Sequence, residues 1–554
     1  MTIENGRGAD EGPGTPVAPM RWDGWGDPER AEALPFAVRS LLPLLLGRVR
    51  RPVPGPDLAE VRLEPSAFTA EDAGAFAALL GVQHVRTDAE SRIRHAGGRS
   101  TPDLLRRRSA AQSATDAVLL PANHDEVVAC LRLAAERDLA VIPFGGGTSV
   151  VGALDPERGT HRAVVSLDLA RLTGLLRFDA VSAEAVLAAG TTGPAAERLL
   201  AAERMELGHY PQSFRYATIG GFAAARSSGQ NSAGHGRFET MVTGIRVATP
   251  TGDIELGRSP GSAAGPDLVR LFLGSEGIFG VITEVRVRVH PIPVDRVMES
   301  WTFPDFASGM AALRAVAQHG PGPTVIRLSD ETETSVSLAQ VGRIGKALAK
   351  GASAVTVFEG EDVEGRRART SALLRGAGGT SLGDGGAEEW LRTRFDGPYL
   401  RDALLDAGVF CETLETATTW AGLSGLRTAV TEALKAGFTA AGLKSFVMCH
   451  ISHVYPTGAS LYFTVLAPLR PDALDIWAAI KRRGGDAIMA AEGTISHHHA
   501  VGRDHAPWLA EEIGDTGMRI LAAVKRELDP QGIMNPGAVL GAATPVPAAP
   551  GGEA

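Results

Sequence analysis

Three consecutive histidines, His497, His498 and His499, lie inside the segment EGTISHHHAVGRDHAPWL, which covers residues 492–509. Imidazole titrates near neutral pH, so it suits proton transfer and anion binding, and the neutral ring is also a common metal ligand. An internal run is not a purification tag, because tags are placed at chain ends. Adjacent side chains cannot all face one ion, and no carboxylate stands at an obvious ligand spacing. The run could therefore be a metal cluster, a solvated loop or part of a catalytic site, and the rest of the chain must decide among these.

A second group of candidate residues is rich in glycine and hydroxyl side chains. Consecutive glycines let backbone amides converge on an anion, and neighbouring hydroxyls add hydrogen-bond donors. The spacing of the run PFGGGTS at 143–149 matches neither the dinucleotide fingerprint nor the P-loop. Two more Gly-, Ser- and Thr-rich segments follow at 210–256 and 271–287. Three such loops together predict a cradle for a long, flat ligand that carries a diphosphate.

Alternating strand and helix patterns must position these loops. A short apolar strand at 117–121 is followed by a helix at 123–138, which opens on an Asn cap, and by a strand at 140–144 that runs into the triple glycine. Further strands are predicted at 163–169, 183–190, 242–252 and 281–291. From residue 294 to about 540, strand-like and helical segments alternate again. The chain is therefore predicted to be an α+β protein with two main domains.

Composition narrows the functional classes. The chain has 554 residues, 44% of them hydrophobic, and a formal net charge of -9, which argues against a nucleic-acid partner. Its three cysteines, Cys130, Cys411 and Cys449, form no CxxC pair. This excludes a disulfide framework and a thiolate zinc site, and it indicates a reducing cytosol. The start lacks the charged and apolar regions of a secretory signal.

No apolar run approaches the ~20 residues that span a bilayer. The richest run, LLPLLLG at 41–47, is short and broken by Pro43. It indicates a buried helix or an interfacial patch, and residues 36–48 are the candidate for peripheral membrane contact.

The three glycine-rich loops resemble the flavin-binding domain of the vanillyl-alcohol oxidase and p-cresol methylhydroxylase superfamily, over residues 112–293. The resemblance implies FAD held between two α+β subdomains, under an α+β cap domain that shapes the substrate pocket. Some members attach FAD covalently, and His209 and His235 lie near the relevant loops, but we expect hydrogen-bonded loop histidines and noncovalent FAD. The implied FAD contacts are Pro143, Phe144, Gly145, Gly146, Gly147, Thr148, Ser149, Gln212, Ser213, Thr218, Gly220, Gly221, Ala225, Arg226, Ser227, Ser228, Glu276, Gly277, Gly280, Val281 and Ile282.

Five segments of the second domain, PYLRD, TVIRLSD, SHVYPTGASLYFTV, GTISHHHAVG and DPQGIMNPGAVL, resemble the alkyldihydroxyacetonephosphate synthase family. The likeness runs from about residue 98 to 540 and keeps the order of the motifs. It implies that the acyl group of acyl-dihydroxyacetone phosphate is exchanged for a long-chain fatty alcohol through a flavin N5 adduct. The product is an ether lipid precursor, and no net redox change occurs.

The resemblance also implies roles for single residues. Tyr462 matches the family's acid/base tyrosine, and its phenol, with an ordinary pKa near 10, must be tuned by neighbours to serve near neutral pH. His498 and His499 are expected in the pocket, with His497 supporting them. Arg401 matches the substrate-binding arginine and Arg327 another arginine tied to activity, and both carry the guanidinium fork that suits phosphate. His450 departs from the family, because animal relatives carry an arginine there, which leaves the phosphate contacts and the substrate open.

The domain boundaries follow. Residues 1–19 and 542–554 are predicted as disordered tails, 20–111 as a mostly helical region, 112–293 as the FAD-binding domain and 294–541 as the cap, whose end returns to the flavin. We expect a bacterial-type cytoplasmic enzyme, peripheral to the inner face of the membrane, that forms a homodimer.

Three rival interpretations are open. A D-2-hydroxy acid oxidoreductase, similar to D-lactate or glycolate dehydrogenase, would share the FAD domain. In such enzymes that carry a metal, His453 would match the first ligand, but Tyr462 falls near the second and His498 replaces an acidic residue. The second rival interpretation is a new metal site formed by His450, His453 and the histidine run. A flavin-binding protein without catalysis is the third, and it should tolerate Tyr462→Phe.

Overall fold

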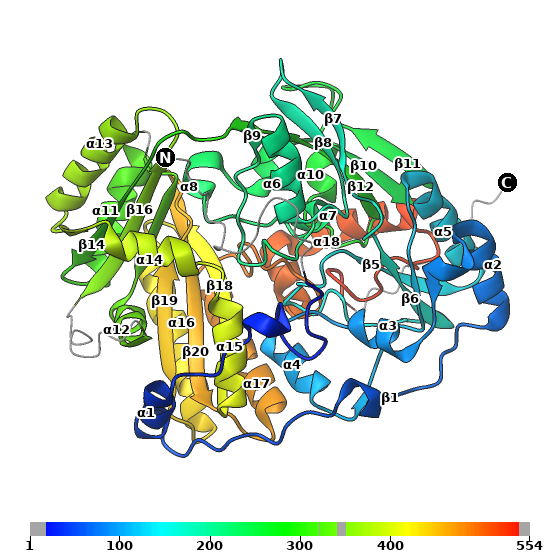
Figure 1. The fold of residues 1–554 in the computed structure, drawn as a ribbon, viewed down its shortest axis with the longest axis horizontal. Coiled ribbons are helices and arrows are strands. Elements are labelled where there is room, and N and C mark those ends of the chain that lie inside the picture. Colours follow the sequence, from blue (N-terminus) through cyan, green and yellow to red (C-terminus); the bar gives the residue numbers. More distant parts are fainter. Residues whose placement is uncertain (1–17, 321, 341–350, 542–554) are drawn as a thin grey trace.

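A computed structural model describes residues 18–320, 322–340 and 351–541 of the chain. The predicted tails at 1–19 and 542–554 therefore lie outside the described residues, apart from residues 18 and 19. The described part forms two halves that lie next to each other (Figure 1). One half contains the glycine-rich loops at 143–149, 210–256 and 271–287 and is called the flavin-loop half. The other half is built around a seven-stranded sheet.

The first half contains a four-stranded sheet and a five-stranded sheet. In the first sheet β4, β6 and β5 are parallel and β2 joins antiparallel, in the order β2-β4-β6-β5. The second sheet, in the order β11-β10-β12-β8-β7, is antiparallel. The bounds are β2 Val85–Arg86, β4 Ala117–Leu119, β5 Leu139–Phe144, β6 Ala163–Asp168, β7 Leu175–Asp179, β8 Glu184–Ala188, β10 Val242–Thr249, β11 Gly252–Leu256 and β12 Val281–Arg288.

These elements confirm the strands predicted between 117 and 291. The predicted helix is α5, His124–Glu136, and the side chain of its N-cap Asn123 accepts a hydrogen bond from the amide of Glu126. Short helices surround the two sheets of this half: α2 Ala70–Leu80, α3 Ala89–Arg94, α4 Thr101–Arg107, α6 Gly193–Ala202, α7 Ile219–Ala224, α8 Ser232–His235, α9 Phe238–Met241 and α10 Leu268–Phe272. Four two-residue strands form two further pairs: β1 Arg62–Leu63 with β3 Ala111–Gln112, and β9 Met205–Glu206 with β13 His290–Pro291.

The second half is one antiparallel seven-stranded sheet in the order β17-β14-β16-β15-β19-β20-β18. Its strands are β14 Arg296–Phe303, β15 Val325–Ser329, β16 Ala352–Glu359, β17 Thr380–Gly383, β18 Val409–Thr419, β19 Phe446–Ile451 and β20 Gly458–Pro468. Its helices are α11 Phe306–Gln318, α12 Glu331–Gln340, α13 Val363–Gly376, α14 Gly385–Thr393, α15 Gly397–Asp406, α16 Leu423–Ala440 and α17 Ala473–Ala490.

Strand alternation separates the two faces of this sheet. Ile326, Leu328, Cys449, Leu461 and Phe463 belong to one buried apolar core together with residues of α11, α16 and α17. Because successive side chains of a strand point to opposite faces, the residues between them point away from that core. The opposite face therefore carries the intervening polar side chains.

The chain returns to the first half at its end. Helix α18, Ala506–Leu528, is followed by a segment in which Ile533 and Met534 join the core of β4, β5 and β6. Met534 bridges Val141 of β5, and its carbonyl accepts a hydrogen bond from Lys525. The C-terminal segment is thus part of the flavin-loop half of the structure.

The apolar run near the N-terminus differs from its prediction. Helix α1 spans Phe36–Leu46 and continues through Pro43, which the sequence pattern indicated as a break. The proline lies late in the helix, so only one turn follows it. Leu42 and Leu46 are buried, whereas Phe36 and Leu44 remain 78% and 76% exposed.

Candidate active site

A polar row crosses the seven-stranded sheet on the face away from its apolar core. Glu415 of β18 stands directly opposite Tyr462 of β20, and Tyr462 stands opposite His450 of β19. His450 in turn pairs with Ser329 of β15, and Arg327, two residues earlier, points to the same face. Antiparallel register therefore brings together residues that are up to 135 positions apart, calculated as 462 minus 327.

Tyr462 is surrounded by imidazoles. Its ring stacks on His450 with centroids 4.8 Å apart and on His498 at 5.8 Å, while His499 meets it edge-on at 5.5 Å. Burial, together with the carboxylates of Glu412 and Glu415, raises the pKa of Tyr462 above its ordinary value. The expected tuning of the phenol toward neutral pH is thus not seen. Tyr462 keeps its proton at neutral pH and can donate it.

Glu415 holds the histidine run in place. Its fully buried carboxylate accepts the backbone N–H of His497 at 2.8 Å, of His498 at 3.1 Å and of His499 at 2.9 Å, and the Ser496 hydroxyl at 2.8 Å. Although burial opposes its ionisation, the nearby histidine run holds the pKa of Glu415 well below its usual range. Sequence reasoning missed this residue, since CETLETATT gives no signal that one glutamate is wholly buried.

The side chains of the run form a hydrogen-bonded chain. His497 Nδ1 lies 2.9 Å from His498 Nδ1, and His497 Nε2 lies 2.6 Å from the hydroxyl of Tyr455. Burial lowers the pKa of His499 to about 3 and that of His497 well below its ordinary value. His497 and His499 are therefore neutral near pH 7.

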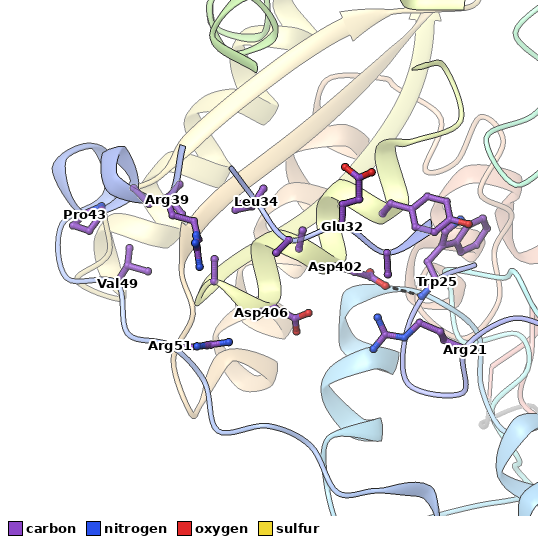
Figure 2. A pocket seen from close by; sticks show the side chains of 16 residues that line it. Arg21, Trp25, Glu32, Leu34, Arg39, Pro43, Val49, Arg51, Asp402 and Asp406 are labelled. Carbon is purple, nitrogen blue, oxygen red and sulfur yellow. Dashed lines mark hydrogen bonds between the residues drawn. The ribbon is translucent and has the colours of Figure 1, made fainter. Parts of the chain in front are cut away.

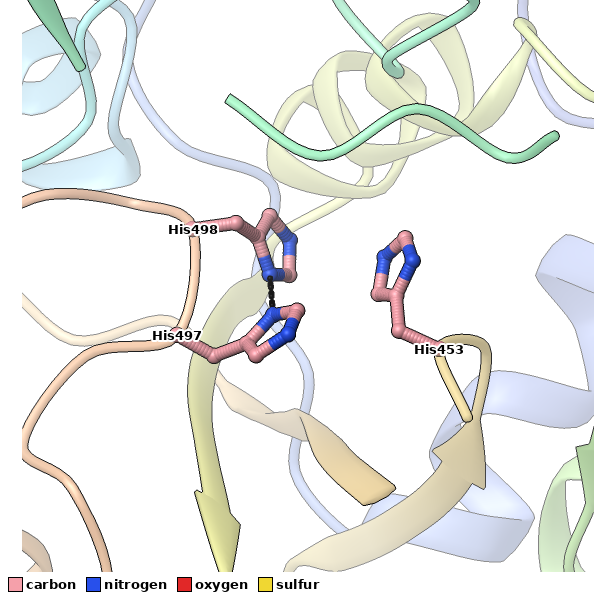
Figure 3. Close-up of side chains that lie close together, drawn as sticks. All are labelled: His453, His497 and His498. Carbon is pink, nitrogen blue, oxygen red and sulfur yellow. Dashed lines mark hydrogen bonds between the residues drawn. The ribbon is translucent and has the colours of Figure 1, made fainter. Parts of the chain in front are cut away.

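Three imidazoles, His453, His497 and His498, lie close enough together to hold a metal ion, with one nitrogen from each within 4.8 Å of the others (Figure 3). Each has a polar partner: His453 Nδ1 lies 2.7 Å from the Ser232 hydroxyl, and His497 and His498 bond to each other. His450 and His499, which the metal alternative also used, are not members of this group. The contacts seen suit a hydrogen-bonded cluster.

The arginine at the far end of the polar row is ion-paired. Arg327 lies 2.5 Å from Glu333 and 2.9 Å from His450 Nδ1, and Glu333 also lies 3.1 Å from His450. Although burial opposes ionisation, interactions with His450 and with the guanidinium of Arg327 lower the pKa of Glu333 to about 2. A substrate phosphate at Arg327 would therefore compete with a carboxylate.

Arg401 lies on α15, outside the polar row. Its guanidinium donates to Asp402 at 2.9 and 2.8 Å and to the carbonyl of Arg99. In the part of the chain that the structure describes, none of its hydrogen bonds reaches Tyr462 or the histidine run. The structure thus joins Tyr462, His450, Arg327 and the histidines, but not Arg401, through direct contacts.

The predicted flavin loops pack into one cradle. A Cβ added at Gly145 would meet Thr218 Oγ1 at 2.5 Å, and one at Gly146 would meet the Tyr216 carbonyl at 2.0 Å. At Gly277, where φ is +81°, a Cβ would meet Pro143 at 2.7 Å. Only glycine allows this approach. Across the described residues, no protein acceptor takes the backbone N–H groups of 145–147, which leaves them free for a phosphate.

The remaining predicted FAD contacts surround this cradle. Thr218 caps α7 and accepts the amide of Gly221, and Glu276 has φ of +48° at the turn into β12. The list divides by element into Gln212 and Ser213 in the loop before α7, Gly220 and Gly221 in α7, Ala225, Arg226, Ser227 and Ser228 after it, and Gly280, Val281 and Ile282 at the start of β12.

Two contacts connect the flavin loops to segments beside the polar row, namely the loop after the histidine run and His453. The Glu276 carboxylate accepts the amides of Val501 and Gly502, just after the histidine run, at 2.9 and 2.7 Å. The Ser228 hydroxyl lies 3.1 Å from His453 Nδ1. The face that carries Tyr462 is therefore turned toward the flavin loops.

The two histidines weighed for covalent flavin attachment have other partners. His209 is fully buried, and its Nε2 lies 2.9 Å from the Ser227 hydroxyl. His235 stacks on His290 with ring centroids 4.5 Å apart. His209 fits the expected hydrogen-bonded loop histidine. His235 does not, because it ends α8, packs on His290, and its buried Nε2 has no hydrogen-bond partner among the described residues.

A cavity of about 390 Å³ lies between α1 and α15, apart from the histidine cluster (Figure 2). Its wall carries both charge signs. The charged residues lining it are Arg21, Glu32, Arg39, Arg51, Asp402 and Asp406. Apolar side chains, among them Leu34, Leu42 and Val49, make up most of the remaining lining. Because the cavity lies apart from the histidine cluster, we assign no substrate to it.

Comparison with known proteins now places the chain in a class. Residues 115–257 match the FAD binding domain family, and residues 292–539 match the C-terminal domain of FAD linked oxidases. The fold resembles that of p-cresol methylhydroxylase solved with substrate bound, at a TM-score of 0.63 and 16% identity over 84% of this chain and 96% of that one. The chain is a flavoprotein of this fold with FAD as its cofactor, which confirms the predicted fold class.

Closer relatives identify the family. Alkyldihydroxyacetonephosphate synthase of Trypanosoma brucei brucei is 31% identical over 94% of this chain and 92% of its own length. A solved alkyldihydroxyacetonephosphate synthase superposes with a TM-score of 0.81 at 28% identity, covering 93% of this chain and 98% of that one. The chain belongs to the alkyldihydroxyacetonephosphate synthase family, as the sequence motifs predicted.

Proposed function

We propose that this flavoenzyme exchanges the acyl group of acyl-dihydroxyacetone phosphate for a long-chain alcohol. The observation that carries the proposal is Tyr462 stacked between His450 and His498 on the face turned toward the flavin loops. In the exchange, the fatty acid leaves with the ester oxygen, the alcohol supplies the ether oxygen, and no net redox change occurs. Bound FAD supplies the reactive centre for this substitution.

The residues around the centre would handle protons. Tyr462 serves as the acid/base residue at the substrate carbon, and because its phenol is protonated near pH 7, it must pass its proton to a neighbouring histidine before it can accept one. His498 and His499 lie within ring contact of Tyr462, so they serve as its proton partners and as the anion site. His497 supports His498 and His499. We further propose Arg327, His450 and Arg401 as the residues that bind the substrate phosphate.

The cradle residues would hold FAD without a covalent bond. The free amides of 145–147 suit its diphosphate, and close packing against 216–218 leaves no room for larger side chains. The hydrogen bond of His209 to Ser227 supports noncovalent attachment. We extend the proposed contacts to the full set of loops at 143–149, 212–228 and 276–282.

We also propose peripheral membrane contact through α1, in a cytoplasmic, homodimeric enzyme whose lipid substrates reside in a bilayer. Phe36, Leu44 and Leu45 are exposed on α1, and exposed arginines follow at 48, 50 and 51. An apolar face flanked by cations suits an anionic membrane surface. Among the described helices, none combines the length and apolarity that crossing a bilayer requires.

The experiment that tests the function uses FAD-loaded protein, palmitoyl-dihydroxyacetone phosphate and labelled hexadecanol. We expect label in an ether product and a fall of about 10²- to 10⁴-fold in rate for Tyr462→Phe, the usual range for losing one acid–base group. Tyr399→Phe is the matched control, because that hydroxyl accepts the Asp27 amide outside the polar row. Absence of label with the wild-type protein, together with anaerobic flavin bleaching by D-2-hydroxy acids, would instead assign the oxidoreductase activity.

A further inference from the structure

The side chains of His498, His497 and Tyr455 form an unbroken hydrogen-bonded chain, in which the proposed function assigns a proton-transfer role only to His498. His498 Nδ1 and His497 Nδ1 are 2.9 Å apart, and His497 Nε2 and the Tyr455 hydroxyl are 2.6 Å apart. Both nitrogens of the His497 ring are therefore engaged, one on each side. An imidazole bonded in this way can accept a proton at one nitrogen and release another from the opposite nitrogen.

The exchange reaction itself requires a route for protons. An ester and an alcohol become an ether and a carboxylic acid, and the acid ionises at neutral pH because its pKa is near 4 to 5, like other carboxyls. Each turnover thus releases one proton, which the alcohol hydroxyl provides. His497 is buried and Tyr462 is half-buried, so a proton that enters the histidine run needs a route through protein groups to reach solvent.

We propose that His497 and Tyr455 relay protons between His498 and solvent, an inference that rests on the proposed exchange activity. A proton on His498 Nδ1 moves to His497 Nδ1, the proton on His497 Nε2 moves to the Tyr455 oxygen, and the phenolic proton leaves to water. Tyr455 is half-buried, and the next two residues, Pro456 and Thr457, are exposed. The relay therefore ends at a half-buried phenol, in a loop whose next residues are exposed.

The contacts of His497 distinguish a proton relay from a purely structural role of the Tyr455 hydroxyl. The backbone of His497 is already fixed by Glu415, which accepts its amide at 2.8 Å, and by Arg237, which donates to its carbonyl at 2.6 Å. The neighbouring ring of His453 stacks on it at 5.0 Å. The Tyr455 hydroxyl is thus not needed to position His497. Its distinctive contribution is the connection to Nε2.

Tyr455→Phe in the FAD-loaded enzyme tests the relay, because it removes the hydroxyl and keeps the ring. We expect turnover to fall about tenfold or more with little change in KM, and the solvent deuterium isotope effect on turnover to increase. Added imidazole buffer should restore the rate in proportion to its concentration, since a mobile base can replace a missing relay group. Tyr399→Phe is the control and should show neither effect.

The possible results separate the relay from the activity on which it rests. Wild-type turnover with an unchanged Tyr455→Phe rate would overturn the relay alone. A slower variant that imidazole does not rescue, with an unchanged isotope effect, would show a structural hydroxyl and would also overturn it. A wild-type enzyme that forms no ether product would overturn the exchange function and the relay together.

Discussion

At the scale of single residues, the motifs predicted which side chains gather, but not what controls them. Tyr462, His498 and His499 meet as expected, because each stands in a recognisable motif. Glu415 stands in an ordinary alternating strand, so its sequence surroundings give no reason to single it out. Its role depends on burial and on four converging donors, which only the folded chain brings together.

Glu415→Gln should disturb the histidine run. The new amide group would place a donor against backbone N–H donors, and a buried unsatisfied polar group costs about 1–3 kcal/mol. We expect the free energy of unfolding to fall by that amount and exchange activity per folded molecule to fall at least about tenfold, because Tyr462 loses its aligned partners. Denaturant titration and the labelled-alcohol assay measure the two effects.

Ser496→Ala is a milder substitution with which to compare Glu415→Gln, because it removes only one hydrogen bond to Glu415. A loss of about 0.5–1.5 kcal/mol with activity largely kept is expected. Equal effects of the two substitutions on activity would contradict the ordering role of the carboxylate.

At the scale of elements, hydrophobic alternation predicted strands well and register not at all. In β20 the apolar residues Leu461, Phe463 and Val465 alternate with Tyr462 and Thr464, so the two faces of this strand could be assigned from sequence, whereas β19 is apolar at every position except His450. Which residue stands opposite Tyr462 depends on pairing between strands far apart in the chain. A shift of one residue would turn Glu415 into the apolar core, so the register is set by burial of the whole face.

One short element gives a pH prediction. Glu206 of β9 is buried, and burial, followed by the charges of Glu197 and Glu359, raises its pKa to about 8. Because the pKa of Glu206 is higher in the folded chain than in the unfolded chain, its contribution to stability is fully present below the unfolded pKa of about 4.5. This contribution is lost as pH rises through the folded pKa of about 8. Glu206→Gln should therefore gain stability relative to wild type between pH 5 and pH 9, by a few kcal/mol at most.

Denaturant unfolding of both proteins at several pH values measures this trend. Glu203→Gln is the control, since Glu203 is exposed at the C-cap of α6. A difference between Glu206→Gln and wild type that stays constant with pH would rule out titration of this carboxyl in the folded protein.

At the scale of the whole molecule, the order of the two halves was readable from the motifs, but their mutual contacts were not. Glu276 reaches the loop after the histidine run, and Ser228 reaches His453, through residues that no local pattern marks as partners. The exposed face of α1 is also a property of the whole fold, because neighbouring elements cover Leu42 and Leu46 and leave Leu44 and Leu45 free.

Vesicle binding tests whether the exposed face of α1 contacts a membrane. We expect the protein to sediment with phosphatidylcholine–phosphatidylglycerol vesicles and Leu44→Glu to weaken binding about tenfold or more, since burying one leucine contributes about 1.5–3 kcal/mol. Val181→Glu is the matched control, because Val181 is 98% exposed on the flavin-loop half. Equal binding by both variants would exclude α1 as the contact surface.

The return of the C-terminal segment has a consequence for how the protein is made. Ile533 and Met534 complete the core around β4, β5 and β6, yet they are synthesised almost 400 residues after β5, calculated as 533 minus 144. While the ribosome is still translating the cap, the flavin-loop half lacks part of its interior. We therefore expect flavin uptake to follow release of the finished chain, so that nascent chains stalled before residue 533 would remain cofactor-free.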